Sequence, residues 1–97
     1  MIRSFADEGS EDLFNGRRTK AACKTCPETL WSIARRKLDA LDYAVRLDDL
    51  RVPPGNRLEA LRGDRKGEYS IRINDQYRIC FRWADSGADD VSVEDYH

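Results

Sequence analysis

The chain has 97 residues, of which 40% are hydrophobic and 36% are charged, and its formal net charge is −1. This length and composition predict a single domain, residues 1–97, that builds a hydrophobic core without help from disulfides. The apolar runs fall far short of the ~18 residues that a membrane-spanning helix needs, so we expect no membrane segment. The first eight residues turn acidic where a secretory signal would be apolar, and we therefore expect a cytoplasmic location.

The near-neutral charge conceals a division along the chain. Residues 1–50 are balanced, whereas residues 51–83 carry eight basic and four acidic side chains, and residues 84–97 carry five acidic and no basic ones. Seven of the eight basic residues in the middle segment are arginines, which bind phosphate in a bidentate manner better than lysine does. The basic middle segment therefore keeps nucleic acid as a possible partner, although the whole chain is slightly acidic.

The three cysteines are an odd number, which argues against a disulfide framework. Cys23 and Cys26 form a CxxC motif, a spacing typical of zinc and redox sites. Tetrahedral zinc needs four ligands, and only Cys80 and His97 could complete the set, without a second paired spacing. We therefore expect free thiols near a helix start, with no metal and no cofactor.

In chain order, residues 2–6 predict a short strand, and residues 10–14 predict a short helix closed by Gly16. Pro27 suits the first position of the next helix, because its missing N–H and fixed φ are tolerated there. This is the clearest helix of the sequence, since its apolar residues recur at three- and four-residue steps. They are Leu30, Ile33, Ala34, Leu38, Leu41, Ala44 and Val45.

After a loop at residues 53–56 the hydrophobic period changes to two. Residues 68–74 and 77–83 alternate around a short polar turn and predict an antiparallel hairpin. Residues 57–62 predict a weaker strand before it, and a last strand through residues 91–94 continues toward the C-terminus. The layout predicts an α+β fold: a small, mostly antiparallel sheet of four to five strands with two N-terminal helices packed on one face.

The alternation also predicts a second, open face of the sheet. Side chains of one parity are apolar and would pack against the helices. Those of the other parity would form the open face: Arg72, Arg78, Cys80 and Arg82. If Val91 and Val93 face the core, the last strand adds Ser92, Glu94 and Tyr96 to the open face, and His97 follows. The arginines either pair with acidic neighbours as ordinary surface residues or meet an anionic partner.

Arginine, tyrosine and histidine together suit the metal-independent cleavage of RNA. The 2′-hydroxyl attacks the adjacent phosphorus, a base takes its proton, and the leaving 5′-oxygen receives one. Fixed positive charge stabilises the phosphorane, a task for arginine because it stays protonated. Histidine, with a pKa of about 6.5, carries protons near neutral pH, whereas tyrosine, at about 10, is a weak base unless its surroundings lower its pKa. Either neighbouring arginines tune Tyr96, or the surroundings of the target assist proton transfer.

Several segments of the chain resemble one known family. The longest spans residues 61–81 (LRGDRKGEYSIRINDQYRICF), and the ending EDYH and the opening IRSFA followed by LFNG accompany it. In this order and at this size they resemble the HigB branch of the RelE/ParE toxin superfamily, which includes plasmid maintenance killer proteins. The resemblance implies a bacterial type II toxin with a RelE-like fold, an endoribonuclease that cuts messenger RNA in the ribosomal A site without metal.

The resemblance also implies partners. Toxins of this branch are silenced by HigA, a helix-turn-helix antitoxin, in a hetero-oligomer that can bind operator DNA through the antitoxin. The 30S A site of the ribosome and the messenger RNA would be the other partners, and no membrane is involved.

Roles for single residues follow from the same resemblance. Arg78 would stabilise the transition-state phosphate, and Arg62, before the Gly-Asp-Arg turn, would bind or polarise phosphate. Tyr96 would orient or deprotonate the 2′-hydroxyl or stack on a base, with Asp95 and His97 completing the terminal site. Contacts to the RNA would come from Arg65, Lys66, Arg72 and Arg82.

Two positions have alternative interpretations. Some relatives carry a histidine near the place of Glu59, so Glu59 either replaces it as an acid–base group or forms a plain ion pair with an arginine. Arg72 lies on the open face by parity, but it could equally pair with Glu68 or Glu94.

Three hypotheses for the function result. The first is the ribosome-dependent endoribonuclease. The second is a ParE-like inhibitor of DNA gyrase that catalyses nothing, because the scaffold is shared and a fold does not determine a function. The third is an interaction module whose arginine face binds an acidic partner.

Overall fold

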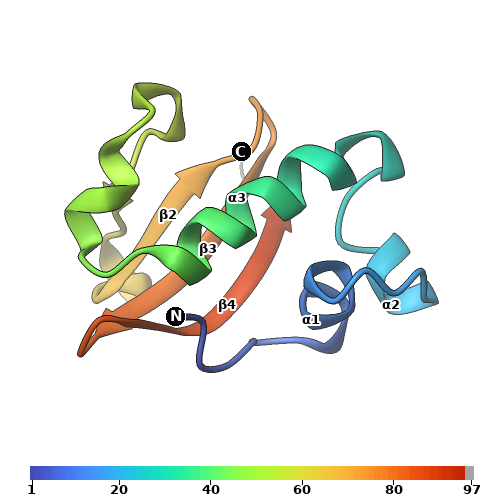
Figure 1. Ribbon diagram of the computed structural model, residues 1–97, viewed down its shortest axis with the longest axis horizontal. Helices are drawn as coiled ribbons and strands as arrows, with labels where there is room; N and C mark the ends of the chain where they lie inside the picture. Colours follow the sequence, from blue (N-terminus) through green and yellow to red (C-terminus); the bar gives the residue numbers. More distant parts are fainter. Residues whose placement is uncertain (96–97) are drawn as a thin grey trace.

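Four antiparallel strands form the sheet of the computed structural model, which describes residues 1–95 (Figure 1). They lie side by side in chain order: β1 (Glu59–Ala60), β2 (Glu68–Arg72), β3 (Tyr77–Ala84) and β4 (Gly87–Asp95). The predicted hairpin of β2 and β3 is confirmed. Its register sets Ile71 opposite Ile79, and Ile79 lies opposite Val93 on β4. The apolar positions of neighbouring strands therefore share one face, as the alternation predicts.

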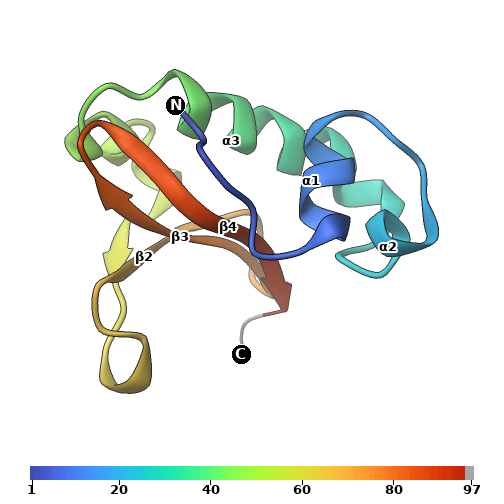
Figure 2. The same ribbon diagram turned by 90° about the horizontal axis from the view of Figure 1, so that it is seen from below.

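The long predicted helix lies over this face (Figure 2), and its apolar stripe joins the apolar strand residues in one core cluster. The segment starts with a 3-10 turn, η1 (Glu28–Leu30), and continues as α3 (Trp31–Tyr43). Four residues of α3 are buried: Trp31, Ala34, Leu38 and Leu41. The prediction that Val45 belongs to the stripe is wrong. The helix ends at Tyr43, the backbone is extended at Ala44, and Val45 is 65% exposed.

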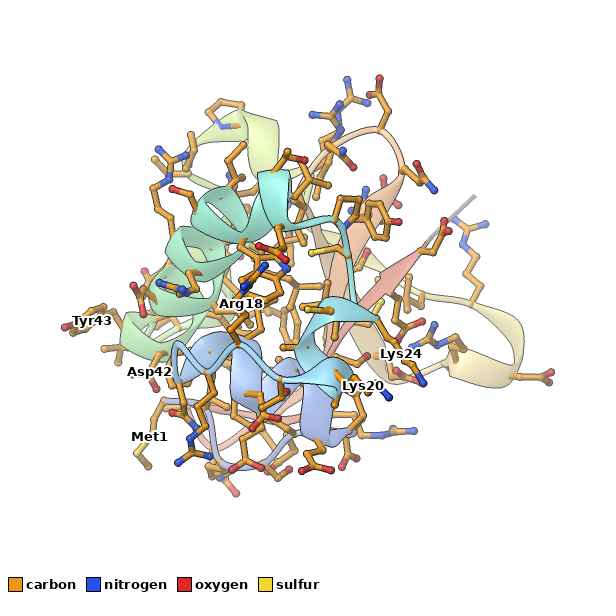
Figure 3. The ribbon with its side chains drawn as sticks, turned by 90° about the vertical axis from the view of Figure 1, so that its right-hand side faces the viewer. Met1, Arg18, Lys20, Lys24, Asp42 and Tyr43 are labelled. Atoms are coloured by element: carbon orange, nitrogen blue, oxygen red, sulfur yellow. The ribbon has the colours of Figure 1, made fainter. Side chains whose placement is uncertain are left out.

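Two short helices, α1 (Glu8–Phe14) and α2 (Lys20–Cys23), lie at one end of the molecule. Each begins with a side-chain cap: Asp7 accepts from the N–H of Ser10, and Thr19 accepts from the N–H of Ala22. A β-carbon at Gly9 would lie 2.4 Å from the carbonyl oxygen of Ala21, so only glycine permits this approach of α1 to α2. The sequence did not predict α2, because its segment is short and polar. Figure 3 views this end, with Lys20 and Lys24 on the surface.

The N-terminal segment runs beside β4 without forming a fifth strand among the described residues. It makes two isolated parallel bridges, Ile2 with Ala88 and Phe5 with Val91. The N–H of Ile2 also donates to Asp42 at 2.8 Å, near the end of α3, where Figure 3 labels both Met1 and Asp42. The strand predicted over residues 2–6 is therefore a bridged segment at the edge of the sheet.

Two 3-10 turns, η2 (Leu47–Arg51) and η3 (Pro54–Asn56), connect α3 to β1. Leu50 joins the core, and the buried amide of Asn56 donates to the carbonyl oxygens of Leu50 and Val52. Its oxygen accepts from Lys37. The predicted loop is thus tied to both the core and α3.

This arrangement confirms the α+β fold with helices on one face of an antiparallel sheet. Within residues 1–95, no helix is both long and apolar enough to cross a membrane.

Candidate functional site

The sheet face turned away from the helices is a buried polar layer. Ser70, Cys80 and Ser92 lie opposite one another on β2, β3 and β4, and their exposed fractions are 0%, 0% and 6%. Arg78, on the same face, is 8% exposed. The expectation of an open arginine face is wrong for its centre, because groups from residues 57–67 reach across it. Figure 2 shows the chain around η4 (Gly63–Arg65) extending beyond the sheet on the side away from α3.

Within residues 1–95, hydrogen bonds to three acceptors hold the guanidinium of Arg78. Nε donates to Ser70 Oγ at 2.8 Å, and Nη2 donates to the carbonyl oxygens of Arg57 and Ser70 at 2.6 and 3.4 Å. These three acceptors are neutral oxygens, and the bonds orient the guanidinium plane. A guanidinium held in one orientation is suited to stabilising negative charge that develops on a phosphate.

The carbonyl of Arg57 that accepts from Arg78 belongs to a residue in the left-handed backbone region. Arg57 has a φ of 46° and a ψ of 58°, a conformation that costs a non-glycine residue roughly 1–2 kcal/mol. Its own N–H donates to the Pro54 carbonyl at 3.1 Å and closes η3. The strained residue is therefore part of the support for Arg78, in keeping with the occurrence of such strain at functional sites.

A cavity of about 630 Å³ lies along β1, next to this support. Among the described residues, Glu59, Ala60, Leu61 and Arg62 line it. Glu59 is the strand partner of Ser70, so its side chain belongs to the face that holds Arg78. The volume falls within the range of about 300–1,000 Å³ that is usual for small-molecule sites.

Arg65 is the centre of an ion-pair network on the same face. From η4, its guanidinium contacts Glu68 on β2 at 2.9 Å and both carboxylate oxygens of Glu94 on β4 at 2.6 and 2.7 Å. Ser92 Oγ donates another bond to Glu94 at 2.5 Å. Since β3 lies between β2 and β4, Arg65 spans the strand that carries Cys80.

The network shifts the pKa values of its members. Hydrogen bonds from Arg65 are the main cause that lowers the pKa of Glu94, and the carboxylates of Glu94 and Glu68 raise the pKa of Arg65. Burial, followed by the negative charge of Glu94, raises the pKa of Cys80 to about 12. At neutral pH, Glu94 is therefore a carboxylate, and Cys80 is a protonated thiol without nucleophilic character.

Two further arginines predicted to bind RNA are also engaged in ion pairs. Arg72 pairs with Asp75 in the hairpin turn, rather than with Glu68 or Glu94 as the sequence left open. Arg82 lies 3.9 Å from Glu68 and 3.7 Å from Asp90.

The remaining predicted cations, Arg62 and Lys66, are exposed and have no ion-pair partner within residues 1–95. Arg62 lines the β1 cavity, and Lys66 follows η4. Their charges are therefore open to a ligand, and their roles stay predictions.

Asp95 does not share the face of Arg78. It is the strand partner of Tyr77, one position beyond the pair of Arg78 and Glu94, so its side chain belongs to the helix-covered face. Gln76 Nε2 donates to its carboxylate at 3.1 Å. Tyr96 and His97 lie outside the described residues, and their predicted roles are not tested by the structure.

The CxxC motif spans the end of α2. Cys23 is exposed and Cys26 is buried, and neither forms a disulfide. Within the described part of the chain, no group of three or more potential His, Cys, Asp or Glu ligands is placed to hold a metal ion. Burial raises the pKa of Cys26, which suits a structural thiol.

Sequence reasoning missed the support of Arg78 and the partners of Arg65. Ser70 could have been found from its parity, since it alternates with Tyr69 and Ile71. Neither the main-chain acceptor at Arg57 nor the pairing of Arg65 with a residue 29 positions away leaves a signal in the sequence.

Solved structures of bacterial toxins have the same fold. The YoeB–YefM complex from Staphylococcus aureus aligns with 100% of this chain and 98% of that chain, with a TM-score of 0.61 at 15% identity. A YafQ mutant from E. coli aligns with 98% of this chain and 93% of that chain, with a TM-score of 0.57 at 16% identity. The fold is therefore that of the RelE-like toxins.

Sequence comparison defines the family within this class. Residues 3–97 match the family model described as the RelE-like toxin of the type II toxin-antitoxin system HigB. Toxin HigB-1 of Vibrio cholerae serotype O1 is 40% identical over 88 residues, which are 91% of this chain and 90% of that protein. Endoribonuclease HigB of Proteus vulgaris is 31% identical over 97 residues, which are 100% of both chains. The chain belongs to the HigB-like family of RelE-like toxins.

Proposed function

We propose that this toxin is an endoribonuclease that cuts translated messenger RNA in the ribosomal A site, and that an antitoxin neutralises it. The observation that carries the proposal is Arg78, a nearly buried guanidinium with fixed orientation on the sheet face to which Glu59, a lining residue of the β1 cavity, also belongs. The name of the Proteus vulgaris relative, an endoribonuclease, supports the same activity.

The reaction needs no group beyond the RNA and side chains. The 2′-oxygen attacks the adjacent phosphorus while its proton passes to a base, and the bond from phosphorus to the 5′-oxygen breaks as that oxygen gains a proton. The products are a 2′,3′-cyclic phosphate and a 5′-hydroxyl. Arg78 stabilises the charge that accumulates on the phosphorane oxygens, and this electrostatic contribution is typically the largest one in catalysis.

The last two residues of the chain carry out the proton transfer. Tyr96 acts on the 2′-hydroxyl as base or orienting group, and His97 supplies the proton carrier of suitable pKa. Glu59 is a further acid–base candidate, because it lines the cavity on the face of Arg78. Asp95 acts from the other face, by holding the strand end through Gln76.

Binding of the RNA falls first to Arg62 and Lys66, the predicted cations without ion pairs in the described structure. The ribosome completes the site, because one histidine and one tyrosine of high intrinsic pKa make a weak acid–base pair by themselves. Naked RNA is therefore cut slowly.

The neutralising partner is a HigA-like helix-turn-helix antitoxin in a hetero-oligomer that binds operator DNA. One neighbour in fold, YoeB of Staphylococcus aureus, is known as a heterotetrameric complex with YefM, described as a toxin–antitoxin complex. This precedent supports an antitoxin partner.

Primer extension on a message translated in a purified extract tests the proposal. The wild-type toxin should produce new 5′ ends within translated codons, fewer ends on the same message without ribosomes, and no change in DNA supercoiling by gyrase. An intact message together with inhibited supercoiling would overturn the proposal in favour of a ParE-like gyrase inhibitor.

A further inference from the structure

A second cavity, of about 370 Å³, lies between α3, η3 and the end of β2. Within residues 1–95, its lining includes three cationic side chains and no carboxylate: Arg36 and Lys37 on α3 and Arg72 on β2. A cavity whose charged groups all have one sign concentrates ligands of the opposite sign. The lining therefore favours an anion.

The three cations of this cavity are close enough to act on one another. Burial is the main cause that lowers the pKa of Lys37, and the positive charges of Arg36 and Arg72 lower it further. Like charges gathered at one place repel each other, and an anion bound between them offsets this repulsion. The arrangement is thus more favourable with an anionic ligand than without one.

The contacts of these cations within the described part of the chain leave most of their charge available. The ammonium of Lys37 donates to the side-chain oxygen of buried Asn56, a neutral group. Arg36 is exposed and forms no ion pair with another residue among positions 1–95. Arg72 pairs with Asp75, whose side chain is 98% exposed, and ion pairs in such contact with water are weak.

The cavity is also next to the proposed cleavage site. Arg72 and Arg78 are strand partners on β2 and β3, and the β-carbons of such partners lie about 4.5–5.5 Å apart. Arg57, whose carbonyl accepts from Arg78, directly follows Asn56 of the cavity wall. Because every nucleotide carries a phosphate, an RNA strand bound at Arg78 brings further phosphates near the cavity.

We propose that this cavity is a phosphate-binding subsite for RNA, in which Arg36, Lys37 and Arg72 hold a phosphate other than the one that is cleaved. This inference rests on the proposed function for the identity of the anion, because the cavity by itself selects only for negative charge. Arginine binds phosphate through its planar fork and lysine as a compact charge. Both the message and the ribosomal RNA offer such phosphates.

The test measures the binding of a short 2′-O-methyl RNA oligonucleotide, which cannot be cleaved because its 2′-oxygen is blocked, and of ribosomes without message. Arg36→Gln and Lys37→Gln each remove one charge from the cavity. Arg35→Gln is the matched control, since it removes the same charge from an exposed position of α3 outside the cavity lining.

For a message phosphate, each cavity variant should bind the oligonucleotide about 3- to 10-fold more weakly at low salt. The slope of log affinity against log salt should become shallower by up to about 0.7, the value for one contact to a single strand. For a phosphate of ribosomal RNA, the same loss should appear with ribosomes and not with the oligonucleotide. Arg35→Gln should stay within about twofold of wild type in both measurements.

Cavity variants that bind both the oligonucleotide and ribosomes as Arg35→Gln does would overturn the proposal. If they then formed a weaker complex with the antitoxin, the cavity would belong to an acidic protein segment instead. Unfolding curves of the variants ensure that equal folded concentrations are compared.

A further measurement needs neither a variant nor cleavage. Gly55 lies in the cavity wall, and its amide resonance in the wild-type protein should shift when inorganic phosphate is added; an unchanged resonance would overturn the proposal. If the toxin binds RNA through the cavity but cuts no message, the proposed function fails and the subsite stands. If it cuts message and the cavity variants bind normally, the subsite fails and the proposed function stands.

Discussion

The two faces of the sheet are equally buried at their centres but are held by different forces. On the helix-covered face, Ile71, Ile79 and Val93 have exposed fractions of 0%, 0% and 6%. One position further along the same strands, the opposite face has the values 0%, 0% and 6% at Ser70, Cys80 and Ser92. The first row is stabilised by apolar burial, which is non-directional, whereas the second is surrounded by hydrogen bonds and ion pairs, which fix orientation.

From this difference we expect the helix-covered face to contribute mainly to stability and the polar face to contribute mainly to activity. A packing defect on the helix-covered face should lower the free energy of unfolding and leave the chemistry of the folded molecule intact. A lost hydrogen bond on the polar face should instead reduce cleavage by a molecule that remains folded. The following substitutions test this division, from the largest expected effect to the smallest.

Ile79→Ala should destabilise the protein by about 2–5 kcal/mol, the usual result of truncating a buried isoleucine and leaving a cavity. Ile79 is fully buried between β2, β4 and the core. Urea unfolding measures the effect, and cleavage assayed at equal folded concentration should match wild type. A loss of cleavage in the folded variant would show that the two faces are not independent.

Ser70→Ala should lower cleavage by about tenfold, because Arg78 loses the acceptor for its Nε while the fold is kept. Ser92→Ala is the matched control: the serine lies on the same face, across Cys80, but its hydroxyl donates to Glu94 and is not the acceptor for Arg78 Nε. Single-turnover cleavage by the two variants compares them. Equal losses would mean that orientation of Arg78 by Ser70 contributes nothing specific.

The polar face should also contribute a distinct acid dependence. Hydrogen bonds from Arg65 lower the pKa of Glu94 below its ordinary value of 4.5, so the carboxylate stabilises the folded state above that pH. The contribution is lost as the pH falls through the lowered pKa. The difference in unfolding free energy between wild type and Glu94→Gln should therefore be constant near neutral pH and shrink as the pH falls below about 4.5 and through the lowered pKa of Glu94. A difference that grows on acidification would contradict the assignment.

The smallest effect concerns the thiols. Cys80 should resist alkylation in the folded protein, since it is buried and its pKa is raised to about 12. Cys26 is also buried, whereas Cys23 is exposed, so iodoacetamide should label Cys23 alone. Mass spectrometry of peptides from the folded and the urea-unfolded protein measures this pattern. Labelling of Cys80 at the rate of Cys23 would show that the polar face opens to solvent.

The helix-covered face could be predicted from the sequence, and the polar face only in part. Apolar periodicity identifies the stripe of α3 and the hairpin because burial acts on every residue of the pattern. Parity also places Arg78 and Glu94 together. The same parity would have placed Asp95 on the opposite face, but the resemblance grouped it with the terminal site.

Contacts that bring distant segments together have no periodic signal. The carbonyl of Arg57 accepts from Arg78, and Arg57 has a left-handed backbone conformation. An arginine at position 57 does not predict this conformation. The path of the η4 segment determines which carboxylates Arg65 contacts. Alternation along the strands does not predict this path. These contacts bury the centre of the face. Because alternation does not predict them, the sequence suggested a solvated arginine face.

The most direct test of the account is the single-turnover rate at which Arg78→Ala cuts ribosome-bound message, with Arg35→Ala, an exposed arginine on α3, as the control. The account predicts a loss of about 100-fold or more for Arg78→Ala at equal folded concentration, because a transition-state charge partner is removed, and a wild-type rate for Arg35→Ala. Cleavage by folded Arg78→Ala at the wild-type rate would contradict the central role given to this guanidinium.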